Sequence, residues 1–267
     1  MRCKGKGKAT ATATAKEGLG EGVAGVGMAT LGTGEKKAGH WSSMWAAGLA
    51  PGQAFDAERS SPVLVRMLRE GRFPTVRGGR VLVPGCGRGY DPVAFAVEGG
   101  AALALGLELS AGAVAAAEAY RDAAVGAAGD AADRIRYAQG NFFERPPEER
   151  HTFDLVFDYT FFCAITPASR AAWGVAMAGL LKEDGELATL MFPEAPLADA
   201  MPPTYPDGLS GPPFPVCEQA YRAALEPAGF HLAWAEPVPP AESHQGRQSR
   251  ETMAVWRKTT KAKATAS

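Results

Sequence analysis

The sequence lacks any close grouping of cysteine and histidine. Its four cysteines and four histidines are scattered along 267 residues, and no two cysteines form a Cys-x-x-Cys pair. Zinc sites and disulfide frameworks both need such groupings. We therefore expect no bound metal and no disulfide, and reduced thiols in an intracellular protein. None of the histidines stands in a recognisable nucleophile motif, so the sequence gives no indication of a catalytic histidine.

Long apolar runs and an excess of either charge are also missing. A membrane span needs about 18 uncharged apolar residues, and the most apolar region is interrupted by Glu108 and Glu118. The 28 lysines and arginines nearly balance the 29 aspartates and glutamates, so there is no electrostatic signature of nucleic-acid or membrane-surface binding. We expect a soluble, cytoplasmic monomer that binds a small molecule, with no nucleic acid and no membrane as partner.

The first part of the chain has a composition of its own. Residues 1–39 are rich in glycine, alanine, threonine and lysine, without a hydrophobic period, and such a segment buries too little surface to offset the entropy lost on ordering. We predict a disordered segment over 1–39, one domain over 40–258 and a disordered tail over 259–267. The basic start of the chain leaves organelle targeting open as an alternative, although it has lysine where transit peptides favour arginine and serine.

From residue 40 onward, short β-rich runs alternate with helical stretches. This alternation predicts a parallel sheet with helices on both faces. A helix is expected from Pro167 to Leu181, with the proline at its first position, and another at about 216–226. Two late runs, 230–238 and 251–258, are expected to pair antiparallel at the end of the sheet. The five runs expected to form the parallel strands are 80–85, 102–109, 134–140, 153–159 and 185–192.

The strongest motif is RVLVPGCGRGYD, in which an apolar strand ends in Gly85, Gly87 and Gly89 and a helix begins near Asp91. Glycines let the backbone turn tightly and approach a ligand that any Cβ would exclude. Dinucleotide oxidoreductases and methyltransferases share such a turn. The third glycine of the dinucleotide pattern is replaced by Tyr90, which favours a cofactor without a pyrophosphate.

Polar residues follow the next two predicted strands. Glu108 ends the second strand, where an acid can accept both hydroxyls of an adenosine ribose; a solvated strand-end glutamate is the alternative. Ser110 is expected to be the N-cap of the following helix. The third strand runs into GNFFE, in which Asn141 and Phe142 are candidates for contacts with adenine or for an ordinary turn and core.

Over roughly 41–257, the chain resembles the thiol and halide methyltransferase branch of the thiopurine S-methyltransferase family. The resemblance is carried by the motifs above together with WSSMW at 41–45, FDLVFDYTFFCAITPASR, GELATLMFP, GPPF and RQSRE. The resemblance implies an α/β, Rossmann-like class I methyltransferase fold, with a mostly parallel seven-stranded sheet, helices on both faces and an N-terminal helical lid. It implies S-adenosylmethionine as the cofactor. The implied contacts are Trp41 and Trp45 over the cofactor, Gly85 and Gly87 on its methionine part, Glu108 on the ribose, Asn141 and Phe142 on the adenine, Tyr159 near the sulfonium and Arg247 facing the acceptor.

The chain departs from that family pattern at several positions. Phe55 stands near the place of a third lid tryptophan, and Ser249 replaces a glycine near the end of the chain. Asn141 takes the place of an aspartate. Val83 replaces the acidic residue common before methyltransferase glycine turns, which leaves the anchor of the cofactor's amino group open.

Methyl transfer from a sulfonium mainly requires alignment of nucleophile, methyl and sulfur, so no catalytic triad is needed. Aromatic faces attract a cation, which suits Trp41, Trp45 and Tyr159. An anionic acceptor needs positive charge, for which Arg247 and Arg170 are candidates; we interpret Arg170 as a helix-surface residue, and Arg250 as the counterpart of Arg247 if the register slips.

We therefore predict S-adenosylmethionine-dependent methyl transfer by in-line displacement to a small thiol, bisulfide, thiocyanate or halide. These acceptors differ by only a few atoms, so the sequence does not rank them. One alternative is a nicotinamide-dependent oxidoreductase, against which the missing third glycine counts. The other alternative is a non-catalytic adenosylmethionine-binding protein.

Overall fold

The computed structural model describes residues 39, 41–126, 130–203 and 211–259. The segments predicted to be disordered, 1–39 and 259–267, lie outside these residues apart from Gly39 and Thr259. Near its start, the described chain has a helical segment at 41–46, which contains both tryptophans of WSSMW.

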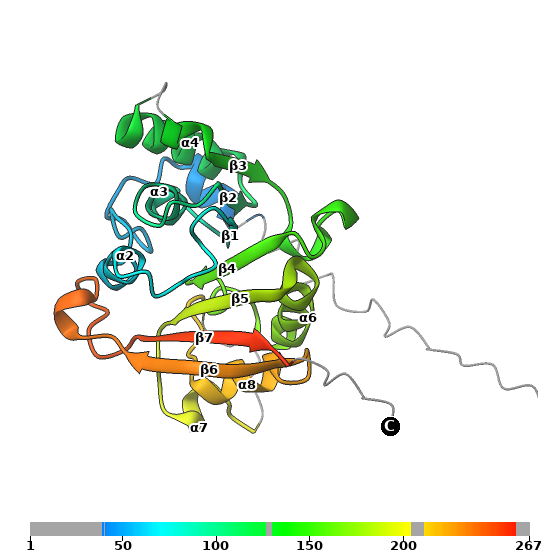
Figure 1. The fold of residues 1–267 in the computed structure, drawn as a ribbon. Coiled ribbons are helices and arrows are strands. Elements are labelled where there is room, and N and C mark those ends of the chain that lie inside the picture. Colours follow the sequence, from blue (N-terminus) through cyan, green and yellow to red (C-terminus); the bar gives the residue numbers. More distant parts are fainter. Residues whose placement is uncertain (1–38, 40, 127–129, 204–210, 260–267) are drawn as a thin grey trace, which may run out of the picture.

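A seven-stranded sheet in the order β3-β2-β1-β4-β5-β7-β6 forms the centre of the molecule (Figure 1). The first five strands pair in parallel, and β7 pairs antiparallel with both β5 and β6. The predicted parallel sheet and its late antiparallel pair are confirmed, with β7 inserted between β5 and β6. The strands are β1 Arg80–Pro84, β2 Leu103–Glu108, β3 Ile135–Gln139, β4 Phe153–Tyr159, β5 Leu181–Met191, β6 Phe230–Pro237 and β7 Thr252–Lys258.

Helices cover both faces of this sheet, as predicted. The helices α2, α3 and α4 pack on one face, in one hydrophobic cluster, and α6 and α8 pack on the other face, in a second cluster. The helix predicted from Pro167 begins as a 3-10 turn and continues as α6. The helices are α2 Pro62–Arg69, α3 Tyr90–Val97, α4 Ala111–Val125, α5 Asp130–Asp133, α6 Arg170–Leu180, α7 Leu197–Ala200 and α8 Glu218–Leu225, and the 3-10 turns are η1 Phe142–Glu144, η2 Pro147–Glu149, η3 Pro167–Ser169 and η4 Pro240–Glu242.

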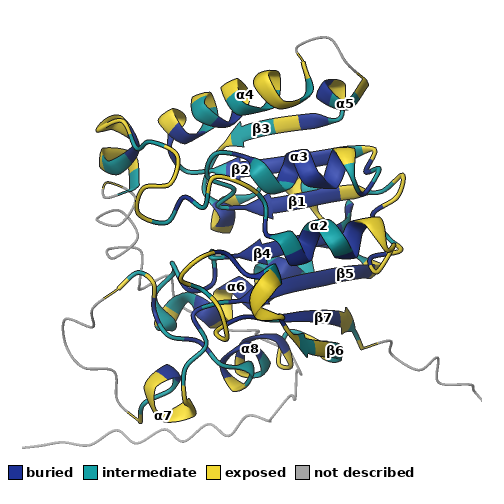
Figure 2. Cartoon of the chain, turned by 90° about the vertical axis from the view of Figure 1, so that its left-hand side faces the viewer, coloured by how far each residue is buried: buried dark blue, intermediate teal, exposed yellow. Residues whose placement is uncertain are grey.

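The apolar character of the central strands follows from their position. Because helices lie on both faces, successive side chains such as Val81, Leu82 and Val83 are all buried. Figure 2 shows this as continuous dark blue along the inner strands, whereas α4 and β3 at one edge carry exposed residues. The described helices include none with the length and apolarity of a bilayer span, and the longest of them, α4, has 15 residues.

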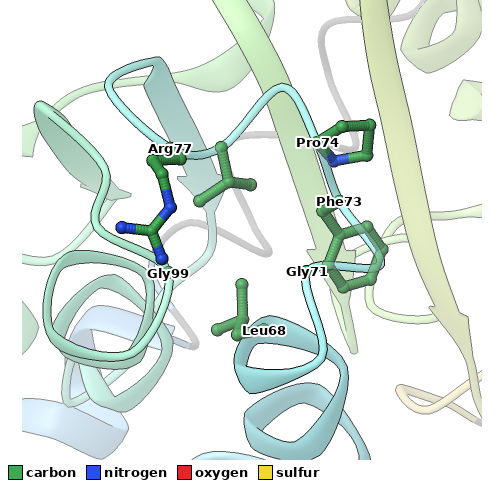
Figure 3. Close-up of a pocket in the computed structure, with 7 residues that line it drawn as sticks. Leu68, Gly71, Phe73, Pro74, Arg77 and Gly99 are labelled. Carbon is green, nitrogen blue, oxygen red and sulfur yellow. The ribbon is translucent and has the colours of Figure 1, made fainter.

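Since β1, β2 and β4 run parallel, their carboxyl ends meet at one edge of the sheet, where such folds bind ligands. A small cavity of about 230 Å³ lies instead near the amino end of β1 (Figure 3). That cavity is therefore remote from the predicted site. Its lining residues are Leu68, Gly71, Phe73, Pro74, Val76, Arg77 and Gly99.

Candidate active site

The glycine turn after β1 has the backbone that its sequence predicts. Gly85, Gly87 and Gly89 all have positive φ angles, of 60°, 54° and 80°, which non-glycine residues rarely adopt. A Cβ at Gly85 would come within 2.7 Å of the Phe161 ring. A Cβ at Gly87 would meet only the Trp45 ring, at 3.9 Å. The turn is therefore a backbone cradle, and a tryptophan of the helical segment 41–46 lies above it.

Glu108 lies beside this cradle at the end of β2. Its Oε1 accepts the Gly87 N–H at 2.7 Å and its Oε2 accepts the Leu109 N–H at 2.9 Å. Burial raises the pKa of the carboxyl, while backbone N–H groups act in the opposite direction. Glu108 lies at the end of the strand, as expected, and its contact with a ribose stays a prediction. With three backbone N–H groups on a carboxylate that has about four acceptor sites, Glu108 retains acceptor capacity for a ribose hydroxyl.

The next helix begins at Ser110, in the expected N-cap position, but the serine hydroxyl forms no capping hydrogen bond. The Ser110 backbone N–H also interacts with the carboxylate of Glu108. The N–H groups of Leu109 and Ser110 thus stabilise the carboxylate of Glu108, and the Ser110 side chain does not cap α4.

Residues 41–58, which we call the lid, contain three aromatic rings, two of which pack edge-to-face against the third. Trp41 and Trp45 lie against Phe55, with ring centroids 5.3 Å and 6.1 Å from its ring. Trp45 is buried and also approaches Gly112 at the start of α4. Phe55 therefore contacts both lid tryptophans, in the region where the sequence departs from the family pattern.

Asp56, which the sequence analysis missed, joins the lid to the glycine turn. Its carboxylate accepts hydrogen bonds from Arg88 Nε and from the Tyr90 hydroxyl, both at 2.8 Å. Arg88 also donates to the Leu49 carbonyl, and its guanidinium lies 5.4 Å from the Trp45 ring. Burial alone would raise the pKa of Asp56, but the N–H of Glu58 together with Arg88 and Tyr90 holds it below the usual value.

The only sequence signal for this pair was an arginine inside a glycine motif, which needs an anionic partner once it is partly buried. Arg88 and Asp56 are separated by 32 positions along the chain, so no local pattern connects them. Tyr90, which replaces the third glycine of the dinucleotide pattern, is the second side chain that donates a hydrogen bond to Asp56.

Tyr159 ends β4 at the same edge of the sheet. Its hydroxyl donates to Glu251 Oε1 at 2.6 Å, and the Arg247 guanidinium lies 5.0 Å from its ring centroid. The same guanidinium donates to the Phe55 carbonyl of the lid at 2.9 Å. The structure therefore brings Tyr159, Arg247 and the lid together. Glu251 is a site residue that the sequence analysis recorded only as part of a motif.

His244 stacks on the other side of this group, with its ring centroid 6.2 Å from that of Tyr159. Burial lowers the pKa of His244 to about 4, and Arg247 and Arg59 contribute in the same direction. His244 is therefore neutral near neutral pH, so Arg247 supplies the positive charge beside Tyr159.

The two other arginine candidates lie elsewhere. Arg250 is exposed and contacts Phe192, so of these two arginines Arg247 is the one that lies beside Tyr159. The interpretation of Arg170 as a helix-surface residue is wrong. Arg170 is buried at the start of α6, its guanidinium lies 4.6 Å from the Phe162 ring, and it donates to the Pro215 carbonyl. The segment around Pro215 covers this end of α6 and excludes the side chain from water.

Asn141 and Phe142 form the turn after β3. The Asn141 side chain accepts the Phe143 N–H at 3.1 Å and donates to Glu144, so it caps η1. Phe142 is buried and packs edge-on against Phe161, 5.0 Å away between centroids. Phe161 thus lies between Phe142 and Gly85 and links the predicted adenine and methionine regions. The contact of Asn141 and Phe142 with adenine stays a prediction.

Several buried polar atoms lack a hydrogen bond of ordinary geometry in the part of the chain that the structure describes, although Ser60 lies beside Asp91 and Ser243 beside Glu251. Buried polar groups are nearly always paired, so unpaired ones in residues that interact with Arg247, such as Asp91, His244 and Glu251, fit a polar ligand. The atoms are Ser60 Oγ, Ser61 Oγ, Asp91 Oδ1, Ser243 Oγ, His244 Nε2 and Glu251 Oε2.

Comparison with known proteins gives sequence relatives over most of the chain. The chain is 37% identical over 221 residues to "Thiocyanate methyltransferase 1" of Brassica oleracea, covering 82% of this chain and 85% of the relative. It is 37% identical over 196 residues to "Probable thiol methyltransferase 2" of Arabidopsis thaliana, covering 73% and 75% respectively.

Among solved structures, the 1,6-didemethyltoxoflavin-N1-methyltransferase of Burkholderia thailandensis, with bound S-adenosylhomocysteine, has a similar fold. The TM-score is 0.59 at 17% identity, over 89% of this chain and 94% of that one. This likeness shows the class I methyltransferase fold. A family model described as thiopurine S-methyltransferase matches residues 36–260.

The family match and the fold agree with the cradle and with the carboxylate beside it. The cofactor of the matching family is S-adenosylmethionine, and it is the cofactor of this chain. The nicotinamide alternative loses its basis, because its glycine turn is explained by the methyltransferase fold. With a family model that matches residues 36–260 and a relative that is 37% identical over 82% of it, the chain belongs to the thiopurine S-methyltransferase family.

Proposed function

We propose that this protein transfers a methyl group from S-adenosylmethionine to a small thiol or to an anion such as thiocyanate, bisulfide or a halide. The relatives named for thiocyanate and thiol methylation support this acceptor class. The observation that carries the proposal is the position of Arg247, whose guanidinium faces Tyr159 at the carboxyl end of β4. A cation at that place can bind an anionic nucleophile next to the cofactor.

The chemistry needs little beyond alignment. S-adenosylmethionine supplies a methyl group on a positively charged sulfur, which is already an activated leaving group. Tyr159 presents an aromatic face, which stabilises a nearby cation. Arg247 binds and orients the acceptor and favours its anionic form, since a thiolate is a far better nucleophile than a thiol.

The lid excludes water from this site. Trp45 covers Gly87, and Arg247 donates to the lid carbonyl of Phe55, so the residue that binds the acceptor also contacts the closed lid. Methyl transfer in a site without bulk water strengthens the attraction between Arg247 and an anion. In this proposal Gly85 and Gly87 bind the methionine part, Glu108 the ribose, Asn141 and Phe142 the adenine, and Trp41 and Trp45 cover the cofactor.

The proposal extends to a cytoplasmic monomer that binds no nucleic acid. The near balance between 28 basic and 29 acidic residues supports the last point. Size-exclusion chromatography with light scattering tests the oligomeric state, and a dimer would contradict it.

The function is tested by incubating the purified protein with S-adenosylmethionine and thiocyanate, iodide, bisulfide or an organic thiol. We expect S-adenosylhomocysteine and the methylated acceptor in equal amounts, measured by chromatography. With thiocyanate, kcat/KM should stay nearly constant across the pH range in which a thiol ionises, and with a thiol it should rise with pH, because only the thiolate reacts readily. Cofactor binding without turnover on any of these acceptors would instead support the non-catalytic alternative.

Glu108→Gln tests the assignment of the ribose. The amide keeps the side-chain volume and one acceptor oxygen but loses the charge, so we expect S-adenosylhomocysteine to bind about tenfold more weakly. Binding is measured by calorimetry, with Glu118→Gln on the exposed face of α4 as the control. An unchanged dissociation constant would mean that Glu108 only organises the glycine turn.

A further inference from the structure

Asp91 is a buried acid without a role in the mechanism described above. It lies in the first turn of α3, two positions after Gly89 of the glycine turn. Its Oδ1 is buried and accepts no hydrogen bond from the described residues. The Ser60 hydroxyl lies nearby, but its oxygen also lacks a hydrogen bond of ordinary geometry. A buried carboxylate oxygen in this state is costly unless a ligand pairs with it.

The other acids at this edge of the sheet each accept at least one hydrogen bond from the described residues, whereas Asp91 Oδ1 accepts none. Glu108 interacts with the backbone N–H groups of Gly87, Leu109 and Ser110. Asp56 accepts hydrogen bonds from Arg88 and Tyr90. Asp158 accepts the Phe162 N–H and the Trp173 indole N–H. Glu251 accepts the Tyr159 hydroxyl on one oxygen. Asp91 forms no ion pair with any described residue, although Arg247 lies within electrostatic reach.

The strand before the glycine turn cannot supply a charge. In this chain the position two residues before Gly85 is Val83, which is buried in the hydrophobic core. The methionine part of the cofactor carries an ammonium group that must be compensated when it leaves water. The chain segment that directly follows the glycine turn, the start of α3, offers an acid with an unpaired oxygen.

We propose that the carboxylate of Asp91 binds the α-ammonium group of S-adenosylmethionine, in place of the acid that Val83 replaces. The proposal rests on the cofactor assignment and adds a binding residue to it. Asp91 and Arg247 then divide the site by charge. Asp91 compensates the cationic end of the cofactor, and Arg247 compensates the anionic acceptor.

The surroundings of Asp91 agree with this role. Burial raises the pKa of Asp91 to about 6, while Ser60 and Arg247 act in the opposite direction. Near neutral pH the group is therefore mostly ionised yet poorly compensated by the protein itself. The other titratable groups near it, Cys86, Tyr120 and Tyr137, are uncharged at this pH because burial raises the pKa of each. A bound ammonium would stabilise the ionised form.

The test compares two ligands that differ only at the amino group. One is S-adenosylhomocysteine, and the other is its desamino analogue, in which hydrogen replaces that group. Binding of both is measured by calorimetry to the full-length protein and to Asp91→Asn. Glu218→Gln is the control, because Glu218 is also an acid in the first turn of a helix, α8, but lies on the other face of the sheet and pairs with Arg222.

We expect Asp91→Asn to bind S-adenosylhomocysteine about 10- to 100-fold more weakly and the desamino analogue as the parent does. Unchanged binding of the analogue also shows that the variant is folded. Glu218→Gln should bind both ligands normally. Asp91→Glu, which keeps the charge, should retain the preference for S-adenosylhomocysteine and serves as the second variant if asparagine prevents folding.

Equal weakening of both ligands, or no weakening of either, would overturn the proposal and leave Asp91 as an acid at a helix start. Normal binding of S-adenosylhomocysteine with loss of turnover on thiols would also overturn it, since the carboxylate would then act on the acceptor. Failure of the proposed function is distinguishable. A parent protein that binds S-adenosylhomocysteine through Asp91 but methylates no acceptor contradicts the function alone.

Discussion

Replacing Asp56 with alanine is expected to destabilise the closed lid by about 3 to 5 kcal/mol, the range for removing one partner of a buried ion pair. The side chain of Asp56 is 2% exposed and that of Arg88 is 14% exposed. Without Asp56, Arg88 keeps its charge beneath the lid, and Tyr90 loses the acceptor of its hydroxyl. Both groups regain hydrogen bonds only when water enters, which requires the lid to open.

The loss should appear locally rather than in the whole domain. Residues 41–58 contribute no strand to the sheet, so they can open while the sheet stays folded. We expect amide hydrogen exchange in residues 41–58 to accelerate strongly and S-adenosylhomocysteine to bind more weakly, with a smaller change in the melting temperature. A global loss of stability with an unchanged lid would contradict this interpretation.

Two comparisons sharpen the experiment. Glu98→Gln breaks an ion pair with Arg69, whose side chain is 64% exposed, and such surface pairs contribute little to stability because water screens them. This control should leave the lid unchanged. The pH dependence provides the second comparison. The pKa of Asp56 is held below 3.8, so its contribution is present above that pH and is lost only as the pH falls further.

The fold and the cofactor cradle could be predicted because their signals are local. An apolar run that ends in alternating glycines specifies a strand and a tight turn within a dozen residues, and Gly85 and Gly87 have the positive φ angles that this requires. Glu108 was found for the same reason, since parallel strands place their carboxyl ends at one edge. The family resemblance added Tyr159 and Arg247, which the structure brings together.

What the sequence did not reveal depends on contacts between distant segments. Asp56 and Arg88 pair across the lid, and Phe161 fills the space between Gly85 and Phe142. No periodicity connects such positions. The error at Arg170 has a related cause, because helical spacing shows which residues share a face but not which loop covers that face. The Pro215 carbonyl that accepts its hydrogen bond is 45 positions away.

Arg247→Ala is expected to lower kcat/KM for thiocyanate roughly 30-fold or more, which corresponds to a loss of about 2 to 5 kcal/mol of transition-state stabilisation. The reason is that the anion would enter a partly buried site without its counter-charge. The affinity for S-adenosylhomocysteine should change much less. Steady-state kinetics with each acceptor and calorimetry with the cofactor product measure the two effects separately. Arg250→Ala is the matched control, since Arg250 belongs to the same loop but is exposed and contacts Phe192 instead of Tyr159.

The hydrogen bond from Arg247 to the Phe55 carbonyl gives this arginine a second possible task, to hold the lid. Arg247→Lys separates the two, because lysine keeps the charge but lacks the planar group that lies over Tyr159 and reaches Phe55. If charge is what matters, lysine restores much of the activity toward thiocyanate, and the alanine variant loses more activity toward thiocyanate than toward a neutral thiol. Equal losses for both acceptors, together with faster hydrogen exchange in the lid, would make Arg247 a lid contact and remove it from the acceptor site.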